Sequence, residues 1–237
     1  MTLLFATLLA AAALTSNCPT DATAQAAACR AVAADKAGDY AGAAQSFEDA
    51  AGKSAPGDPA ADRALAAAGN MWIAANQPGK AALALDRALA GTGLLADQRG
   101  LALLDRARAA EAQGDLKTAR VKLTAAAETI SEDPFLWYFS AALAIRENDA
   151  TTAKVAINRA LTMIPDDPTV LFEAGHVFHY AGEDSKAREY WTKALAADPR
   201  GPSGQAAKRA LAMLDVPLTV TGKVTTQPNF DGEKKKD

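Results

Sequence analysis

The sequence contains few of the residues that build metal or catalytic centres. Among 237 residues there are two histidines and two cysteines, too few for a multi-histidine metal centre, a four-thiolate zinc site or a disulfide-dense scaffold. Aromatic residues make up only 6%, which disfavours β-sandwiches and barrels. The formal net charge of -3 excludes the broad positive field that nucleic-acid binding requires. We therefore expect no cofactor and no nucleic-acid partner.

Motifs of catalytic centres are also missing. No glycine-rich phosphate loop follows a predicted strand, and the sequence has neither a Gly-x-Ser-x-Gly elbow nor a Cys/His pair with a nucleophile's spacing. Acidic residues such as Asp39, Asp115 and Asp149 fall in predicted turns, where aspartate caps helices. We assign no catalytic residue and expect a protein that is not an enzyme.

An uncharged apolar run occupies the N-terminus from Leu3 to Leu14. A dozen or so residues is too short for a bilayer span of about 20 and fits the apolar core of a signal peptide. We predict a signal peptide at residues 1–16, with cleavage between 13 and 24, and no stable membrane span afterwards. The protein would then be periplasmic or secreted. The alternative is an apolar helix packed on the fold.

The position of that cleavage decides the cysteine chemistry. If the cut lies near Ser16, Cys18 survives and could form a disulfide with Cys29 in an oxidising compartment. If the cut follows Ala24, Cys29 remains as a small buried hydrophobe. A lipid anchor on Cys18 is a third alternative, although Thr15-Ser16-Asn17 matches a lipobox poorly.

Alanine fills 60 positions, which favours closely packed helices, and part of this alanine recurs at a fixed interval. The pattern is an alanine, three residues, a large apolar residue, two residues and a second alanine. It occurs at Ala43/Phe47/Ala50, Ala81/Leu85/Ala88, Ala119/Leu123/Ala126, Ala153/Ile157/Ala160 and Ala187/Trp191/Ala194. Successive first alanines are 38, 38, 34 and 34 residues apart, so the chain is an array of five units.

Two further positions keep step with this pattern. Five residues before each first alanine stands a glycine or asparagine, the types that best tolerate a left-handed backbone at a helix end: Gly38, Asn76, Gly114, Asn148 and Gly182. Twelve residues before it stands a residue small enough to let another helix approach: Ala31, Gly69, Ala107, Ala141 and Gly175. Each unit is therefore predicted to be two antiparallel helices joined by a tight turn.

These residues resemble the tetratricopeptide repeat (TPR) family, whose helix-turn-helix unit has 34 residues. The fifth unit matches the family signature at Leu171, Gly175, Phe178, Gly182, Ala187, Trp191, Ala194, Leu195 and Pro199. The resemblance implies an all-α, right-handed α-solenoid of five TPR-like repeats at residues 24–57, 62–95, 100–133, 134–167 and 168–201. The longer steps after the first two repeats predict extended loops at Gly57 to Pro59 and Gly91 to Gly93.

Beyond the repeats, apolar residues at helical spacing from Ala207 to Leu214 predict a C-terminal capping helix at 202–215. Such a helix would cover the hydrophobic face that the last repeat leaves open. Residues 216–237 are polar and are expected to form a disordered tail, with Lys234, Lys235 and Lys236 near its end.

In the TPR family the first helix of each unit lines a concave surface, so the resemblance implies a partner-binding groove there. Its positions in repeats three to five carry the aromatic and arginine side chains typical of interfaces. The candidate groove residues are Leu104, Arg108, Phe135, Tyr138, Arg146, Phe172, His176, His179 and Tyr180. Repeats one and two have no aromatic ring on this face, so we expect the groove to centre on the C-terminal half. Phe135 and Phe172 could instead pack between repeats.

The predicted function is that of a non-enzymatic adaptor in the cell envelope that holds a protein or peptide partner. Arg108 and Arg146 would contact acidic groups or backbone carbonyls of that partner. One alternative is a structural or self-associating subunit that uses its convex face, and a homo-oligomer is compatible with it. Another is a metal-dependent activity through His176 and His179, with Glu173 or Glu183 as a third ligand. We expect the histidines to line the groove instead.

Overall fold

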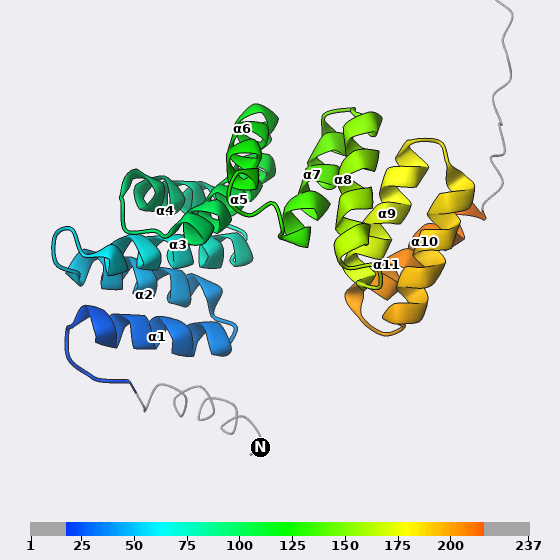
Figure 1. Ribbon diagram of the computed structural model, residues 1–237. Helices are drawn as coiled ribbons and strands as arrows, with labels where there is room; N and C mark the ends of the chain where they lie inside the picture. The colour runs from blue at the N-terminus through cyan, green and yellow to red at the C-terminus, as the bar shows by residue number, and fades with distance from the viewer. Residues whose placement is uncertain (1–17, 216–237) are drawn as a thin grey trace, which may run out of the picture.

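The computed structural model describes residues 18–215, and within them the chain forms eleven α-helices and no strand (Figure 1). The helices are α1 (Ala24–Lys36), α2 (Tyr40–Lys53), α3 (Pro59–Ala74), α4 (Pro78–Ala90), α5 (Ala96–Ala112), α6 (Leu116–Ala127), α7 (Pro134–Arg146), α8 (Ala150–Met163), α9 (Pro168–Tyr180), α10 (Asp184–Ala197) and α11 (Pro202–Leu214). The predicted signal peptide at 1–16 and the predicted tail at 216–237 lie outside the described residues.

Ten of these helices form five hairpins, and each hairpin turns at the residue that the sequence singles out. Gly38, Asn76, Gly114, Asn148 and Gly182 all have a positive φ, between 55° and 82°. Aspartates follow directly in three turns and accept a hydrogen bond from the first turn of the second helix. One of them, Asp149, accepts from the hydroxyl and backbone N–H of Thr152 at 2.6 and 2.9 Å, which lowers its pKa below the ordinary value. These aspartates are helix caps.

The small residues of the repeat lie where helices cross. All ten alanines of the repeated pattern are buried, and so are the five small residues in the first helices. A single large side chain in each of the last four units fills the space between them: Leu85, Leu123, Ile157 and Trp191. The prediction of an all-α solenoid of helical repeats is thus confirmed.

Gly57 and Gly91 to Gly93 lie in loops as predicted, at 54–58 and 91–95, but these loops are no longer than the loop at 128–133, and most of the extra residues of the longer units lie in helices. Helices α3 and α5 have 16 and 17 residues, whereas α7 and α9 have 13 each. Asp58 and Pro59 start α3 early, because the Asp58 carboxylate caps Ala60 N–H at 2.8 Å and proline suits the first helical position. Gln98 similarly accepts from the Leu95 N–H at 3.1 Å at the start of α5.

The hairpins follow one another along a curved path from α1 to α11, at opposite ends of Figure 1. Helix α11 packs on α9 and α10. Its Ala207 is buried, and Leu211 and Leu214 contact the cluster around Trp191, while Lys208 and Arg209 face solvent. No helix within residues 18–215 has the length and apolar character needed to cross a bilayer.

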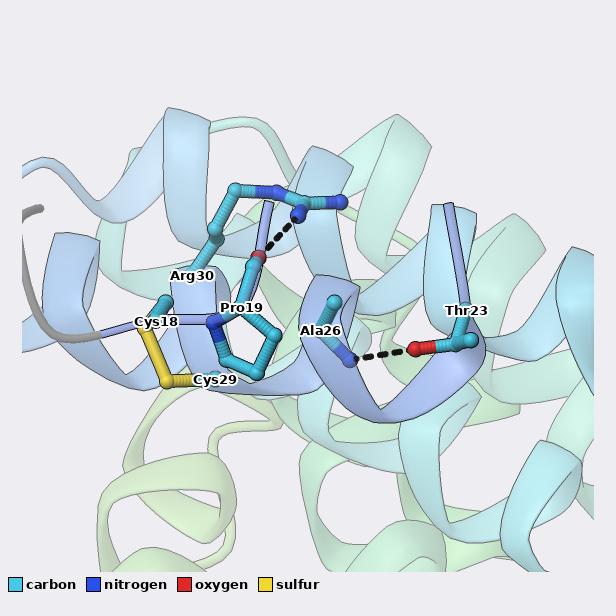
Figure 2. The surroundings of a disulfide bond; sticks show 6 residues. All are labelled: Cys18, Pro19, Thr23, Ala26, Cys29 and Arg30. Carbon is cyan, nitrogen blue, oxygen red and sulfur yellow. Dashed lines mark hydrogen bonds between the residues drawn. A yellow bond between two sulfur atoms is a disulfide. The ribbon is translucent and has the colours of Figure 1, made fainter. Parts of the chain in front are cut away.

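A disulfide joins Cys18 to Cys29 at the start of the fold, with Cα atoms 5.6 Å apart (Figure 2). It ties the segment before α1 to that helix, on the side that carries Ala28 and Val32. Arg30 donates to the Pro19 carbonyl at 3.5 Å, and Thr23 caps α1 by accepting from the Ala26 N–H at 3.2 Å. Of the three alternatives for Cys18, the structure contains the disulfide.

The close helix crossing at Gly175 predicts a specific mutational effect. A Cβ there would overlap the Trp191 ring, which is held in place by its hydrogen bond to the Phe172 carbonyl at 3.1 Å. We expect Gly175→Ala to lower the free energy of unfolding by about 1–3 kcal/mol through overpacking. Gly52→Ala is the matched control, because a Cβ there meets no atom within 4 Å and alanine favours a helix. Urea unfolding followed by circular dichroism measures both; equal midpoints would contradict the prediction.

The disulfide predicts a second effect. We expect the double variant Cys18→Ser, Cys29→Ser to lose about 2–3 kcal/mol of unfolding free energy, because the cross-link restricts the unfolded chain. Dithiothreitol should lower the stability of the wild type to that of the variant and leave the variant unchanged. The prediction fails if oxidised wild type and variant unfold at the same denaturant concentration.

Candidate partner-binding surface

The candidate surface is formed by the first helices of the hairpins, which we call the inner face: α1, α3, α5, α7 and α9. A cleft of about 550 Å³ lies on it and spans four repeats. Exposed Leu101 and Phe135 contribute apolar surface to this first cleft, and Arg63, Arg108 and Asp133 contribute charge. Apolar side chains exposed beside charged groups are typical of recognition surfaces.

A short polar network organises the floor of the first cleft. Asp105 on α5 accepts a hydrogen bond from Asn70 on α3 at 2.8 Å and another from Arg108 at 2.8 Å. The Arg108 charge is therefore balanced by a carboxylate of its own helix. The Asn70 contact also joins the second repeat to the third, which fixes the width of the cleft.

A second cleft, of about 380 Å³, lies between α9, α10 and α11. Trp191 forms its centre, with the rings of His176 and His179 each 5.7 Å from the indole, and Met213 and Leu214 contribute from α11. His179 Nδ1 lies 2.7 Å from Asp184 Oδ1. This cleft joins the last repeat to the final helix.

Of the two third ligands considered for a metal site, Glu173 lies 3.7 Å from His176 Nδ1, whereas Glu183 is engaged by lysines. Glu183 accepts from Lys154 at 3.1 Å and from Lys186 at 2.6 Å. Within residues 18–215, no group of three or more His, Cys, Asp or Glu side chains is arranged to hold a metal ion. The two imidazoles instead contact aromatic rings and separate carboxylates.

The nine predicted groove residues do not line one continuous groove: some lie in the first cleft, some in the second, and others outside both. Arg108 and Phe135 line the first cleft, and His176 and His179 line the second. The other exposed or half-buried members have local partners: Arg146 is ion-paired with Glu111 of α5, Tyr180 donates to Asn148 at 3.3 Å, and Phe172 lies 4.3 Å from the His176 ring. Each of the two arginines thus has a carboxylate partner within the protein, and their predicted contacts to acidic groups or backbone carbonyls of a partner stay a prediction.

One expectation needs correction. Leu104 is only 7% exposed and belongs to the core around Leu123 and Leu136, so only its edge reaches the first cleft. The groove is expected to centre on the C-terminal half; the first cleft lies over α1 to α7, and the second cleft, at α9 to α11, contains two of the predicted residues. Phe135, at the start of α7, lines the first cleft as its position within the repeat predicts, whereas Phe47, from a second helix, also lines it and was not predicted.

Glu173 on α9 is a feature that the sequence marked only as a possible metal ligand. It is 8% exposed, one of two buried polar side chains among the described residues. Burial raises the pKa of Tyr138 on the neighbouring helix α7, and the negative charge of Glu173 raises it further. The Glu173 carboxylate therefore lies close enough to α7 for its charge to affect the ionisation of Tyr138.

Comparisons with known proteins agree with this architecture. No family model matches the sequence, and no curated protein matches it. Among solved structures, the APC/C hetero-tetramer Cut9-Hcn1 has a TM-score of 0.68 at 14% identity over 87% of this chain, which spans 38% of that chain. PilW, a type IV pilus biogenesis factor, has a TM-score of 0.65 at 17% identity over 78% of this chain and 82% of its own.

A third solved structure is YrrB, described as a TPR protein with an unusual peptide-binding site. Its TM-score is 0.55 at 17% identity, over 84% of this chain and 96% of its own. The chain has the TPR fold.

The position of Glu173 predicts the titration of Tyr138. We expect Tyr138 to ionise above the ordinary tyrosine pKa of about 10 and Glu173→Gln to lower its pKa while leaving it raised, because burial is the larger cause. Ultraviolet titration of tyrosinate, with the Tyr138→Phe curve subtracted, measures this pKa. Glu132→Gln, which removes an exposed carboxylate, should leave it unchanged. A Tyr138 pKa insensitive to Glu173→Gln would contradict the geometry.

Proposed function

We propose that the protein is a non-enzymatic adaptor that holds a partner polypeptide on its inner face, with the first cleft as the main seat. The observation that carries this proposal is the first cleft itself, where Phe135 is 49% exposed beside Leu101 and charged groups of the first three repeats. Exposing a large apolar ring to water is unfavourable, so the position of Phe135 favours contact with another molecule.

The repeat architecture supports this role. Stacked hairpins hold the lining side chains in place before binding, so little ordering of the receptor opposes association. The description of YrrB as a TPR protein with an unusual peptide-binding site agrees with a polypeptide ligand. At 17% identity, the likeness to YrrB concerns the fold alone.

We further propose that the protein works in the periplasm or outside the cell. Three observations support this: the apolar run at Leu3 to Leu14, the Cys18–Cys29 disulfide, which suits an oxidising compartment, and the likeness to PilW.

A specific observation favours a second candidate function, that of a subunit that assembles through its outer side. Leu83, Val121 and Val155 occupy the same position in the second helices of three successive repeats and are 59% to 68% exposed. We call them the outer ridge. The first and fifth repeats have Gln45 and Glu189 there, so the apolar stripe is confined to the middle of the solenoid. Such a stripe fits a second copy or another envelope subunit.

Site-specific photocrosslinking separates the two functions. A benzophenone amino acid replaces Leu101 on the inner face or Leu83 on the outer ridge, and the protein is crosslinked in its own cells. We expect a discrete polypeptide adduct from position 101 that disappears with Phe135→Ala, because that ring is a main apolar contact of the cleft. Denaturing gels and mass spectrometry identify the adduct.

The control is Val155→Ala, which removes a similarly exposed apolar side chain from the outer ridge and should leave the adduct at position 101 intact. Adducts only from position 83, abolished by Val155→Ala, would reject the adaptor proposal in favour of assembly through the outer ridge. Light scattering then tells whether that partner is a second copy.

A further inference from the structure

Two carboxylates occupy equivalent positions on the inner face. Asp105 lies two residues before the small residue Ala107 in α5, and Glu173 lies two residues before Gly175 in α9. The residue three positions later is Arg108 in one case and His176 in the other. Side chains three residues apart are neighbours on a helix surface, so both carboxylates face a basic group of their own helix.

Asp105 has its partners within the protein. Arg108 donates to one oxygen at 2.8 Å and Asn70 of the preceding first helix donates to the other at 2.8 Å. Asn70 is the residue directly after the small Gly69, so the repeat itself supplies this donor. Both oxygens of this half-buried carboxylate are thereby hydrogen-bonded.

Glu173 lacks both donors. The nearest nitrogen of His176 is 3.7 Å from its carboxylate, which is too far for a hydrogen bond. The residue that corresponds to Asn70 in the preceding first helix α7 is Ala142, which has no polar group. Nothing within residues 18–215 donates a hydrogen bond to Glu173.

The carboxylate is still open to an incoming group. Glu173 is only 8% exposed. Among the described residues, every side-chain oxygen that is fully enclosed has a hydrogen-bond partner. Because the Glu173 oxygens have no such partner, both must still contact solvent. A carboxylate removed from most of its water without donors raises the free energy of the structure. A donor from another molecule would offset that loss.

The surroundings favour a cation as that donor. Tyr138 of α7 senses the charge of the carboxylate. The His176 ring, whose Nδ1 is 3.7 Å from the carboxylate, lies 4.3 Å from the Phe172 ring, and aromatic faces attract cations. The nearby arginines do not supply the charge, because Arg108 is paired with Asp105 and Arg146 with Glu111.

We propose that Glu173 anchors a basic side chain, an arginine or lysine, of the polypeptide held on the inner face. This inference rests on the adaptor function and names the partner's chemistry: a polypeptide with a cationic anchor residue, not an acidic one. An extended chain seated in the first cleft continues along the inner face over α7 and α9, where this anchor lies.

The test uses two pools of random heptapeptides with blocked ends, passed over the immobilised, disulfide-bonded protein. Their central residue is arginine in one pool and citrulline, its uncharged isostere, in the other. Because charge-assisted hydrogen bonds contribute about twice as much as neutral ones, we expect the wild type to retain the arginine pool about tenfold better. Mass spectrometry of the eluates measures the ratio.

Glu173→Gln should bring that ratio to about one. Ala142→Asn should do the same while leaving the charge in place, because it restores the donor that Asn70 supplies to Asp105. Glu132→Gln, which removes one charge from a side chain 88% exposed, should keep the preference. Circular dichroism confirms that each variant is folded. A preference that survives Glu173→Gln overturns the proposal.

The other outcomes are equally decisive. Equal retention of both pools by the wild type, lost in a Leu101→Ala, Phe135→Ala variant, would overturn the cationic anchor and leave the adaptor function standing. Retention of neither pool would count against both. Replacing Lys234, Lys235 and Lys236 with serine tests the chain's own basic segment as occupant. A tenfold gain in arginine-pool retention would assign the site to that segment and overturn the assignment to a partner, whereas unchanged retention supports the partner.

Discussion

The structure depends on helices that approach one another more closely than ordinary side chains allow. At Gly69 and Gly175 an added Cβ would overlap Leu85 and Trp191, and in the other units a buried alanine occupies the crossing. Because each hairpin buries small residues against one large side chain, it has little core of its own and is stabilised by its neighbours. The curved array in Figure 1 follows from repeating this contact five times.

Close crossing also determines which side chains are available for binding. One side of each first helix is buried, because its small residue packs against the large core side chain of a second helix. The remaining positions of the first helices form a continuous inner face. Polar contacts such as Asn70 with Asp105 and Arg146 with Glu111 join successive first helices across that face. The inner face is consequently held in shape before any partner arrives, which lowers the ordering cost of binding.

Glu173 departs from the general rule that buried polar groups are paired. Its counterpart Asp105 shows that the fold can satisfy a carboxylate at this position when the neighbouring helix has an asparagine. Local inconsistencies of this kind in an otherwise regular array tend to occur at functional sites. Glu173 keeps the position that Asp105 has in its repeat but lacks the hydrogen-bond donor that Asn70 supplies to Asp105, and the proposed cationic anchor lies at this position of the inner face.

The sequence by itself determined the helical repeats, because the steric demands of turns and crossings act on single residues: all five predicted turn residues have a positive φ, and the patterned alanines are buried. It did not determine how extra residues are accommodated in α3 and α5, since a cap can extend a helix where a loop would also fit. Nor did it place the first cleft, bury Leu104 or pair Arg146 with Glu111. Those outcomes depend on distances between residues of different repeats, and only the packed tertiary structure sets such distances.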